Sequence, residues 1–233
     1  MDFLFPKYCV SCKRVGSYLC ARCFSYLSFD TKGVCLVCER FSIGGLTHPG
    51  CLGKFTIDGT FASIVYQGVA KKLLYTFKYK PYVTDLKNLL IELFYEGLIQ
   101  KEVFYLTYKT AYEEKGGMLV PIPLSLRKQK ERGYNQAKIL AGGLAKKFQL
   151  EVIDCLERIK ETMSQMSLDR EKRKKNVSDA FRVQEQLKKH LKGKTVFLVD
   201  DVLTTGATLS EAANVLKRAG AKKVFGLTLA RGK

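Results

Sequence analysis

The chain has 233 residues, enough for one large domain or for a small domain followed by a medium one. No apolar run approaches the roughly 18 residues that cross a bilayer. Asp2 and Pro6 argue against a secretory signal, so we expect a cytoplasmic protein without a membrane span. Lys and Arg number 40 against 22 Asp and Glu, a net charge of +18. This charge favours nucleic acid, phosphates or an acidic membrane surface as partners, but a merely solubilising lysine-rich surface would also explain it.

Seven of the eight cysteines precede residue 52, and six of them form three Cys-x-x-Cys pairs. The two-residue gap lets both thiolates of a pair face one tetrahedral ion. A His-x-x-Cys unit then repeats the spacing with an imidazole. A redox dithiol and an ordinary surface histidine are the alternatives, but three pairs within 30 residues favour zinc. The candidate ligands are Cys9, Cys12, Cys20, Cys23, Cys35, Cys38, His48 and Cys51.

Eight ligands suffice for two closed four-ligand zinc sites, which would be structural rather than catalytic. We expect the first two pairs to share one ion and the remaining ligands to hold a second. A module of residues 1–54 buries too little core to fold alone, so zinc would stabilise it. Cys155 lies far away and is expected to be a small buried residue. We find no internal repeat beyond the pairs themselves.

Next along the chain, a strand is predicted at residues 61–66, a helix at 69–79 and a second helix at 86–98, whereas 100–117 is ambiguous. From residue 118 strands and helices alternate. Strands are expected at 118–122, 151–153, 195–199 and 224–229, and helices at 133–148 and 209–219. Residues 157–178 are charged and without apolar period, which predicts a long mobile loop. This order indicates a mostly parallel α/β sheet.

The strongest chemical signal follows the predicted strand at 195–199. Asp200 and Asp201 stand at its carboxyl end, where open α/β sheets bind their ligands. Two adjacent carboxylates are costly to bury unless hydroxyls or cations meet them, and ribose hydroxyls with Mg²⁺ would do so. The following turn has small and hydroxyl residues whose N–H groups can close on a phosphate before a helix. These residues are Thr204, Thr205, Gly206, Ala207 and Thr208.

With these residues the sequence resembles a known family. The segment from Asp200 to Thr208 looks like the phosphoribosyl pyrophosphate signature of type I phosphoribosyltransferases. The ComF branch, the competence-associated proteins of bacteria, is similar in further segments: Val120 to Leu124, Glu131 to Ala137, Arg158, Thr162, Gln165, Arg173 and Asn176-Val177. The cysteine pairs resemble the zinc ribbon usual in that branch, although the last unit is His-x-x-Cys. The resemblance covers nearly the whole chain apart from about 55–117.

The resemblance implies a type I phosphoribosyltransferase fold over residues 55–233, a mostly parallel sheet flanked by helices, behind a double zinc-ribbon-like module at residues 1–54. It implies that Asp200 and Asp201 meet the ribose of phosphoribosyl pyrophosphate with Mg²⁺ nearby, and that residues 204–208 hold the 5′-phosphate. The pyrophosphate would lie at Pro123, Leu124 and Ser125. The 157–178 loop would close over the substrate. Because pyrophosphate release develops negative charge, mobile basic residues of this loop would help, and the candidates are Arg170, Lys172 and Arg173, with Arg173 as the catalytic cation. A merely solvated charge run is the alternative.

Arg132, Asn135 and Gln136 open the helix at 133–148 beside this site. They could contact a phosphate or simply cap the helix, and the sequence leaves both interpretations open.

Two functions follow as hypotheses. The first is an enzyme that transfers a phosphoribosyl group to an unknown acceptor, gripped by residues 55–117 and the zinc module. The second is an accessory protein of DNA uptake that binds single-stranded DNA and works with a competence helicase or other uptake proteins. Residues 127–194 carry 19 basic and 9 acidic side chains, with a dense run at 170–175, and Tyr134 and Phe181 could stack on bases. A zinc-ribbon transcription factor would leave the phosphate loop unused.

Overall fold

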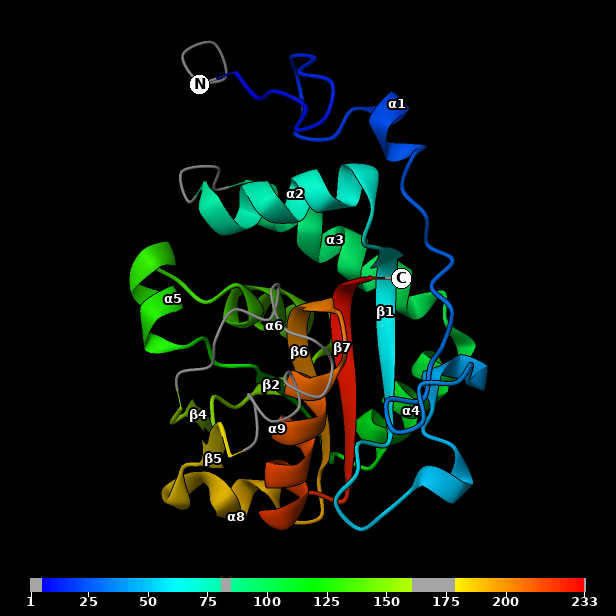
Figure 1. The fold of residues 1–233 in the computed structure, drawn as a ribbon, viewed down its shortest axis with the longest axis vertical. Helices are drawn as coiled ribbons and strands as arrows, with labels where there is room; N and C mark the ends of the chain where they lie inside the picture. Colours follow the sequence, from blue (N-terminus) through cyan, green and yellow to red (C-terminus); the bar gives the residue numbers. More distant parts are fainter. Residues whose placement is uncertain (1–5, 81–84, 161–178, 233) are drawn as a thin grey trace.

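A parallel five-stranded sheet in the order β1-β7-β6-β2-β3 forms the centre of the computed structural model, which describes residues 6–80, 85–160 and 179–232 (Figure 1). The strands are β1 (Gly59–Val65), β2 (Gly117–Pro121), β3 (Glu151–Val152), β6 (Thr195–Leu203) and β7 (Lys223–Arg231). β6 and β7 are buried along almost their whole length, which explains why their sequences are continuous apolar runs rather than alternating ones.

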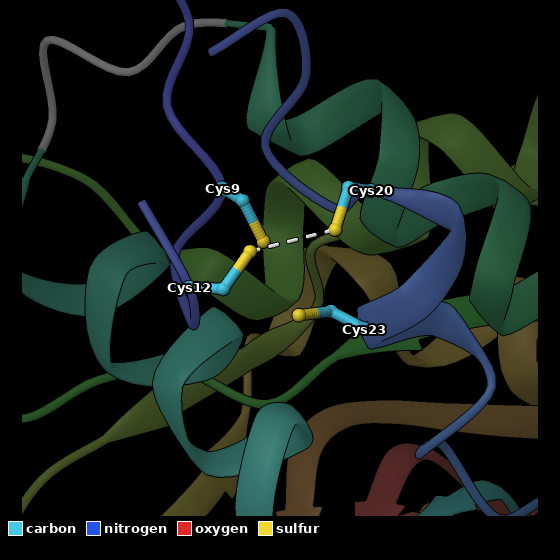
Figure 2. A group of neighbouring side chains, drawn as sticks. All are labelled: Cys9, Cys12, Cys20 and Cys23. Atoms are coloured by element: carbon cyan, nitrogen blue, oxygen red, sulfur yellow. Dashed lines mark hydrogen bonds between the residues drawn. The ribbon is translucent and has the colours of Figure 1, made fainter. Parts of the chain in front are cut away.

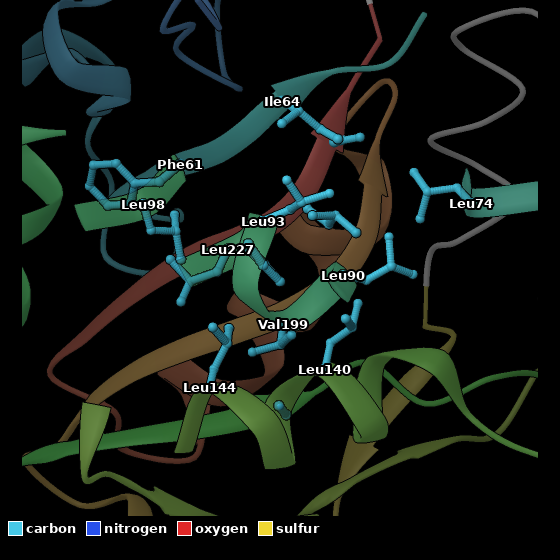
Figure 3. Packing of buried hydrophobic residues seen from close by; sticks show 14 of the residues in the cluster. Phe61, Ile64, Leu74, Leu90, Leu93, Leu98, Leu140, Leu144, Val199 and Leu227 are labelled. Carbon is cyan, nitrogen blue, oxygen red and sulfur yellow. The ribbon is translucent and has the colours of Figure 1, made fainter. Parts of the chain in front are cut away.

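Helices cover one face of this sheet: α2 (Gly68–Tyr79), α3 (Leu86–Ile99), α4 (Glu102–Glu113) and α6 (Gln136–Phe148). Leu90 of α3 and Leu140 of α6 belong to the same buried cluster as Val199 of β6 and Leu227 of β7 (Figure 3). This cluster is the larger of the two cores, and it fixes α2 and α3 against the edge of the sheet where β1 lies.

The second core lies on the opposite face. Here Val196 and Leu198 of β6 pack with α9 (Ala207–Arg218) and with the antiparallel pair β4 (Leu156–Arg158) and β5 (Phe181–Val183). A short 3₁₀ turn, η4 (Glu185–Leu187), and α8 (Lys188–Leu191) complete this side. Because successive residues of β6 point to opposite faces, one strand supplies both cores. The prediction of an α/β phosphoribosyltransferase-type fold behind a cysteine-rich module is confirmed.

In the described part of the N-terminal segment, from residue 6 onward, the helices are short turns, α1 (Ala21–Phe24), η1 (Ile43–Gly45) and η2 (Pro49–Cys51), and the segment runs along the outer edge of β1 (Figure 1). The N–H of Val65 donates to the Ser28 carbonyl at 2.8 Å, and Thr31 Oγ1 donates to the Ala62 carbonyl at 2.7 Å. An edge strand exposes unpaired backbone groups, so this segment shields the sheet from pairing with other chains.

Several elements differ from the sequence prediction. The ambiguous residues 100–117 contain α4, and a short helix, α5 (Leu126–Arg132), precedes the expected helix, which begins only at Gln136. The break between them is Gly133, whose φ of 76° ends α5 in a left-handed conformation. The start of the predicted 157–178 loop is wrong, because residues 157 and 158 pair with β5 in β4; residues 161–178 lie outside the described part. None of the described helices is long and apolar enough to cross a membrane.

Candidate functional site

Asp200 and Asp201 lie near the carboxyl end of β6, as the sequence predicts, but a cation already meets them. Lys78 of α2 places Nζ 3.0 Å from Asp201 Oδ1 and 2.9 Å from Oδ2, with side-chain exposures of only 18% and 12%. Asp200 accepts a 2.8 Å hydrogen bond from the N–H of Asp201. A lysine from a helix that is distant in sequence therefore balances one of the two carboxylates.

The two carboxylates differ in their acidity. Burial and the neighbouring charge of Asp201 raise the pKa of Asp200 to about 7, although the Asp201 N–H, Lys78 and Arg158 act in the opposite direction. Burial alone would lower the pKa of Lys78, but Asp201 outweighs it and the pKa is raised. The pair thus holds Lys78 charged, while Asp200 can exchange a proton near neutral pH.

The turn after β6 leads directly into the N-terminus of α9. Gly206 precedes α9 with φ 75°, a left-handed conformation that favours glycine, and within the described residues no side chain caps the helix. The first N–H groups of a helix have no partner within it and carry partial positive charge, so this terminus suits an anion. The hydroxyl of Thr205 is buried and has no hydrogen-bond partner among the described residues.

A cavity of about 500 Å³ lies between this turn, the end of β2 and the exposed side of α2. Of the predicted ligand residues, those that line it are Asp200, Asp201, Thr204, Gly206, Thr208, Pro123 and Leu124. The other three do not line it: Ala207 is buried, Thr205 has its hydroxyl buried, and Ser125 Oγ accepts from the Lys128 N–H to cap α5. At these three positions no side chain reaches the cavity. Arg173, the predicted catalytic cation, lies outside the described residues.

The lining of this cavity also contains basic residues that the sequence analysis does not assign to the site. Four cations, Lys78, Lys128, Arg132 and Arg158, face the two carboxylates, so the lining carries an excess of positive charge. Burial, then repulsion from Arg158 and Arg132, lowers the pKa of Lys128, which shows how closely these cations are gathered. Such a lining suits a ligand with several negative charges. No sequence motif marks Lys78, whereas Arg132 and Arg158 belong to segments that resemble the ComF branch.

A wall of tyrosines from α2 completes the cavity. Tyr75 and Tyr79 lie one helical turn apart with ring centroids 4.9 Å from each other, and they are 59% and 54% exposed. The Arg132 guanidinium lies 5.3 Å from the ring centroid of Tyr79. Two neighbouring exposed aromatic rings beside cations form a surface on which a planar group can stack.

The structure separates the roles of the three polar residues near α6. Asn135 Oδ1 accepts from the Ala137 N–H at 2.9 Å and so caps α6. Gln136 is completely buried and accepts from Arg132 Nη1 at 3.1 Å. Only Arg132 reaches the cavity. Of the two interpretations, helix capping is therefore confirmed for Asn135. Arg132 is the one residue of the three that lies where it can contact a phosphate.

The suggested stacking by Tyr134 and Phe181 is wrong for the second residue. Phe181 is only 3% exposed, because it belongs to the core beneath α9. Tyr134 is partly buried and donates its hydroxyl to the Phe77 carbonyl. The basic run at 170–175 lies outside the described residues.

The first four cysteines converge on one point (Figure 2). The Sγ atoms of Cys9, Cys12, Cys20 and Cys23 all lie within 4.8 Å of one another, with Cys12 and Cys20 at 3.6 Å. Burial raises the pKa of Cys9, but N–H groups of residues 11, 12 and 20 outweigh it and lower the pKa to about 6. A thiolate surrounded by three other sulfur atoms is the donor set that zinc prefers.

The second group consists of Cys35, Cys38, His48 and Cys51, whose ligand atoms also lie within 4.8 Å of one another. His48 Nδ1 is 3.2 Å from Cys38 Sγ, and Nε2 is 3.0 Å from the Phe41 carbonyl. A carbonyl only accepts, so Nε2 carries the proton and the lone pair of Nδ1 points at the cysteines. The imidazole is thus oriented as a metal ligand, and the residues fit zinc in the predicted grouping.

The two cysteine groups share one backbone design, which contradicts the expectation of no repeat beyond the pairs. The N–H of Cys9 donates to the Arg14 carbonyl at 2.8 Å, and that of Cys35 to the Arg40 carbonyl at 3.1 Å. The residue after the second cysteine of each first pair has a positive φ, 65° in one group and 62° in the other. The repeat is also visible in the sequence, because residues 9–14 and 35–40 both read Cys-x-x-Cys-x-Arg.

Another cavity of about 500 Å³ lies between segment 30–45 and β1. Its charged residues are dispersed, with Arg231 donating to the Lys32 carbonyl, and it contains neither the carboxylate pair nor the α9 terminus. Although it is as large as the first cavity, its lining therefore does not indicate a ligand site.

The sheet order, the carboxylate pair and the turn before α9 define a phosphoribosyltransferase-type domain. A family model of the phosphoribosyl transferase domain matches residues 132–233. Competence protein ComFC of Bacillus subtilis is 28% identical over 97% of this chain and 84% of its own length. Competence protein F of Haemophilus influenzae is 34% identical over 48% of this chain, and the DNA utilization protein YhgH of Escherichia coli is 35% identical over 46%.

The last two alignments span about half the length of those relatives, 49% and 45%. Together with the cysteine groups and the fold, these similarities support a ComF-family, phosphoribosyltransferase-like protein.

Proposed function

We propose that this protein binds phosphoribosyl pyrophosphate with Mg²⁺ in the cavity above β6 and acts as a phosphoribosyltransferase-like protein in DNA uptake. The observation that carries the proposal is the coincidence of the Asp200–Asp201 pair, four cations and the uncapped terminus of α9 on one cavity. The names of the relatives, which refer to competence and DNA utilization, support the biological role.

Each part of the ligand meets a suitable group. The 5′-phosphate would lie at the N–H groups of residues 204–208, and the ribose hydroxyls would donate to Asp200 and Asp201. Mg²⁺ would balance the pyrophosphate charge next to the carboxylates. In a transfer reaction the bond from C1 of the ribose to pyrophosphate breaks and a bond to the acceptor forms, so the pyrophosphate keeps the electron pair and the acceptor loses a proton.

The cations would stabilise that leaving group. Lys128 and Arg132, on and at the end of α5, are close to Pro123 and Leu124, where the family resemblance places pyrophosphate. Negative charge that develops on a leaving group is stabilised by positive groups held in place beforehand. Arg173 remains a proposal for the same role.

Calorimetry with phosphoribosyl pyrophosphate tests the proposal. Binding should need Mg²⁺, and Asp201→Asn should weaken it by at least about 10-fold, the scale of one charge-assisted contact. Asp154→Asn is the matched control, because this exposed carboxylate pairs with Lys138 away from the β6 turn. Absence of binding by the wild type, or equal loss in both variants, would contradict the assignment.

A second candidate is binding of single-stranded DNA, and the tyrosine wall favours it. Bases stack on exposed aromatic rings without sequence preference while cations meet the backbone. Tyr75, Tyr79 and Arg132 offer both features in one place. The same wall could equally hold the acceptor of a phosphoribosyl transfer, since it borders the ribose position.

The zinc sites, the division at residue 54 and a cytoplasmic location complete the proposal. Two structural zinc ions would hold residues 1–54 together, because each closed four-ligand group leaves no coordination position for catalysis.

A further inference from the structure

The second cysteine group touches the phosphate turn through one side chain. Leu36 stands between Cys35 and Cys38 and is 9% exposed. A Cβ atom built on Gly206 would lie 2.6 Å from Leu36 Cδ1 and 2.7 Å from Cδ2. The leucine therefore fills the space in which a side chain at position 206 would stand.

Gly206 lies between the ligand cavity on one side and Leu36 on the other. It lines the cavity that holds the carboxylate pair, and Leu36 is not part of that lining. The leucine thus supports the turn from outside the ligand cavity. Because glycine has the greatest backbone freedom, a turn built on it holds one conformation only when packing restricts it.

The support is anchored to the rest of the domain. Leu36 belongs to the core of Ile57, Leu203 and Leu209, whereas Cys9 and Cys23 of the first group belong to the core of α2 and α3. Next to Ile57, Asp58 binds both the Val224 N–H and Lys217 of α9 at 2.7 Å. Only the second cysteine group is therefore continuous with the phosphate turn.

We propose that the second cysteine group positions the phosphate turn, with Leu36 as the positioning residue, so that its metal state sets the affinity for the ribose-phosphate ligand. The proposal rests on the proposed function for the identity of the ligand. Four ligands drawn together by an ion fix the loop between Cys35 and Cys38, and this loop presses Leu36 onto Gly206. Loss of that fixation frees Leu36 and leaves the turn with several conformations, of which only one binds phosphate.

The test compares two neighbouring residues of the same loop. Leu36→Ala removes the support, and Val37→Ala is the matched control, since Val37 is 41% exposed. In calorimetry with phosphoribosyl pyrophosphate and Mg²⁺, Leu36→Ala should lower affinity about 10-fold and Val37→Ala less than about 2-fold, with unchanged zinc content. Leu36→Met, which restores volume, should recover most of the affinity. Equal affinities for Leu36→Ala and Val37→Ala would overturn the proposal.

Hydrogen exchange separates this proposal from the proposed function. Without any ligand, amides of residues 203–209 should exchange faster in Leu36→Ala and Cys38→Ser than in wild type, and Cys12→Ser should leave them unchanged. If the wild type fails to bind phosphoribosyl pyrophosphate but this exchange pattern appears, the ligand assignment is wrong and the positioning role stands. Unchanged exchange in Leu36→Ala would overturn the positioning role whatever the ligand.

Discussion

Replacing Lys78 by methionine probes the charge balance of the candidate site most sharply. Methionine keeps the length and the apolar stem but removes the ammonium that lies 3.0 Å and 2.9 Å from the two oxygens of Asp201. Asp201 is then left beside Asp200 without its cation. Two neighbouring carboxylates that are largely removed from water repel each other and resist ionisation.

The cost follows from the burial of the pair. Breaking a buried ion pair by removing one partner costs about 3–5 kcal/mol. Here both side chains retain some contact with the cavity, and the carboxylates can bind a proton, so we expect about 2–3 kcal/mol at about pH 8. Loss of the cation raises the pKa of Asp200 in the folded state further above its usual 3.8, because Lys78 is one of the charges that lower it. The loss of stability in Lys78→Met should therefore become smaller as the pH falls toward about 6, because a carboxyl of the folded variant is protonated there.

Urea unfolding of wild type and variants measures this difference. Lys128→Met is the control, because Lys128 lines the same cavity while burial and nearby cations lower its pKa, so its loss should be neutral or stabilising. Adding Asp201→Asn to Lys78→Met should restore part of the lost stability. A Lys78→Met stability within about 0.5 kcal/mol of wild type at about pH 8 would refute the reasoning.

Three further predictions concern the zinc module, the tyrosine wall and Asp200. Cys12→Ser should lose one of about two zinc ions and expose the first cysteine group, residues 9–23, to protease while the second group and the sheet stay folded; digestion throughout the chain would contradict this. Tyr75→Ala with Tyr79→Ala should weaken oligothymidylate binding about 10-fold in fluorescence anisotropy and spare phosphoribosyl pyrophosphate; unchanged anisotropy argues against the wall. A raised folded pKa loses stability as pH rises through about 7, so Asp200→Asn should be roughly 1–3 kcal/mol more stable than wild type at about pH 8 and equal at about pH 4, which a pH-independent difference would exclude.

The sequence carries those features that depend on local pattern. The buried runs of β6 and β7 predict strands because both faces of each strand are covered. The pair at Asp200 and Asp201, followed by small residues, is readable because the whole unit lies within a few positions of the chain. The cysteine grouping is readable for the same reason.

Features that depend on contacts between residues far apart in the sequence cannot be predicted from local pattern. Lys78 meets Asp201 across 123 positions, and nothing in its helix distinguishes it from a solvated lysine. Leu36 reads as an ordinary residue between two cysteines until Gly206 is seen beside it. α4 remained ambiguous because only Phe104 and Ala111 of its residues are buried, which gives little apolar period.

Phosphate binding at the turn before α9 is the central requirement of the proposed function. Titrating ribose 5-phosphate into isotope-labelled protein and following each amide by two-dimensional NMR tests this directly, without turnover or an acceptor. We expect the largest saturable shifts at the N–H groups of residues 204–208 and of Asp201, since these surround the proposed phosphate and ribose. Shifts confined to the lysines of α8 and other surface cations, or none at all, would contradict the assignment.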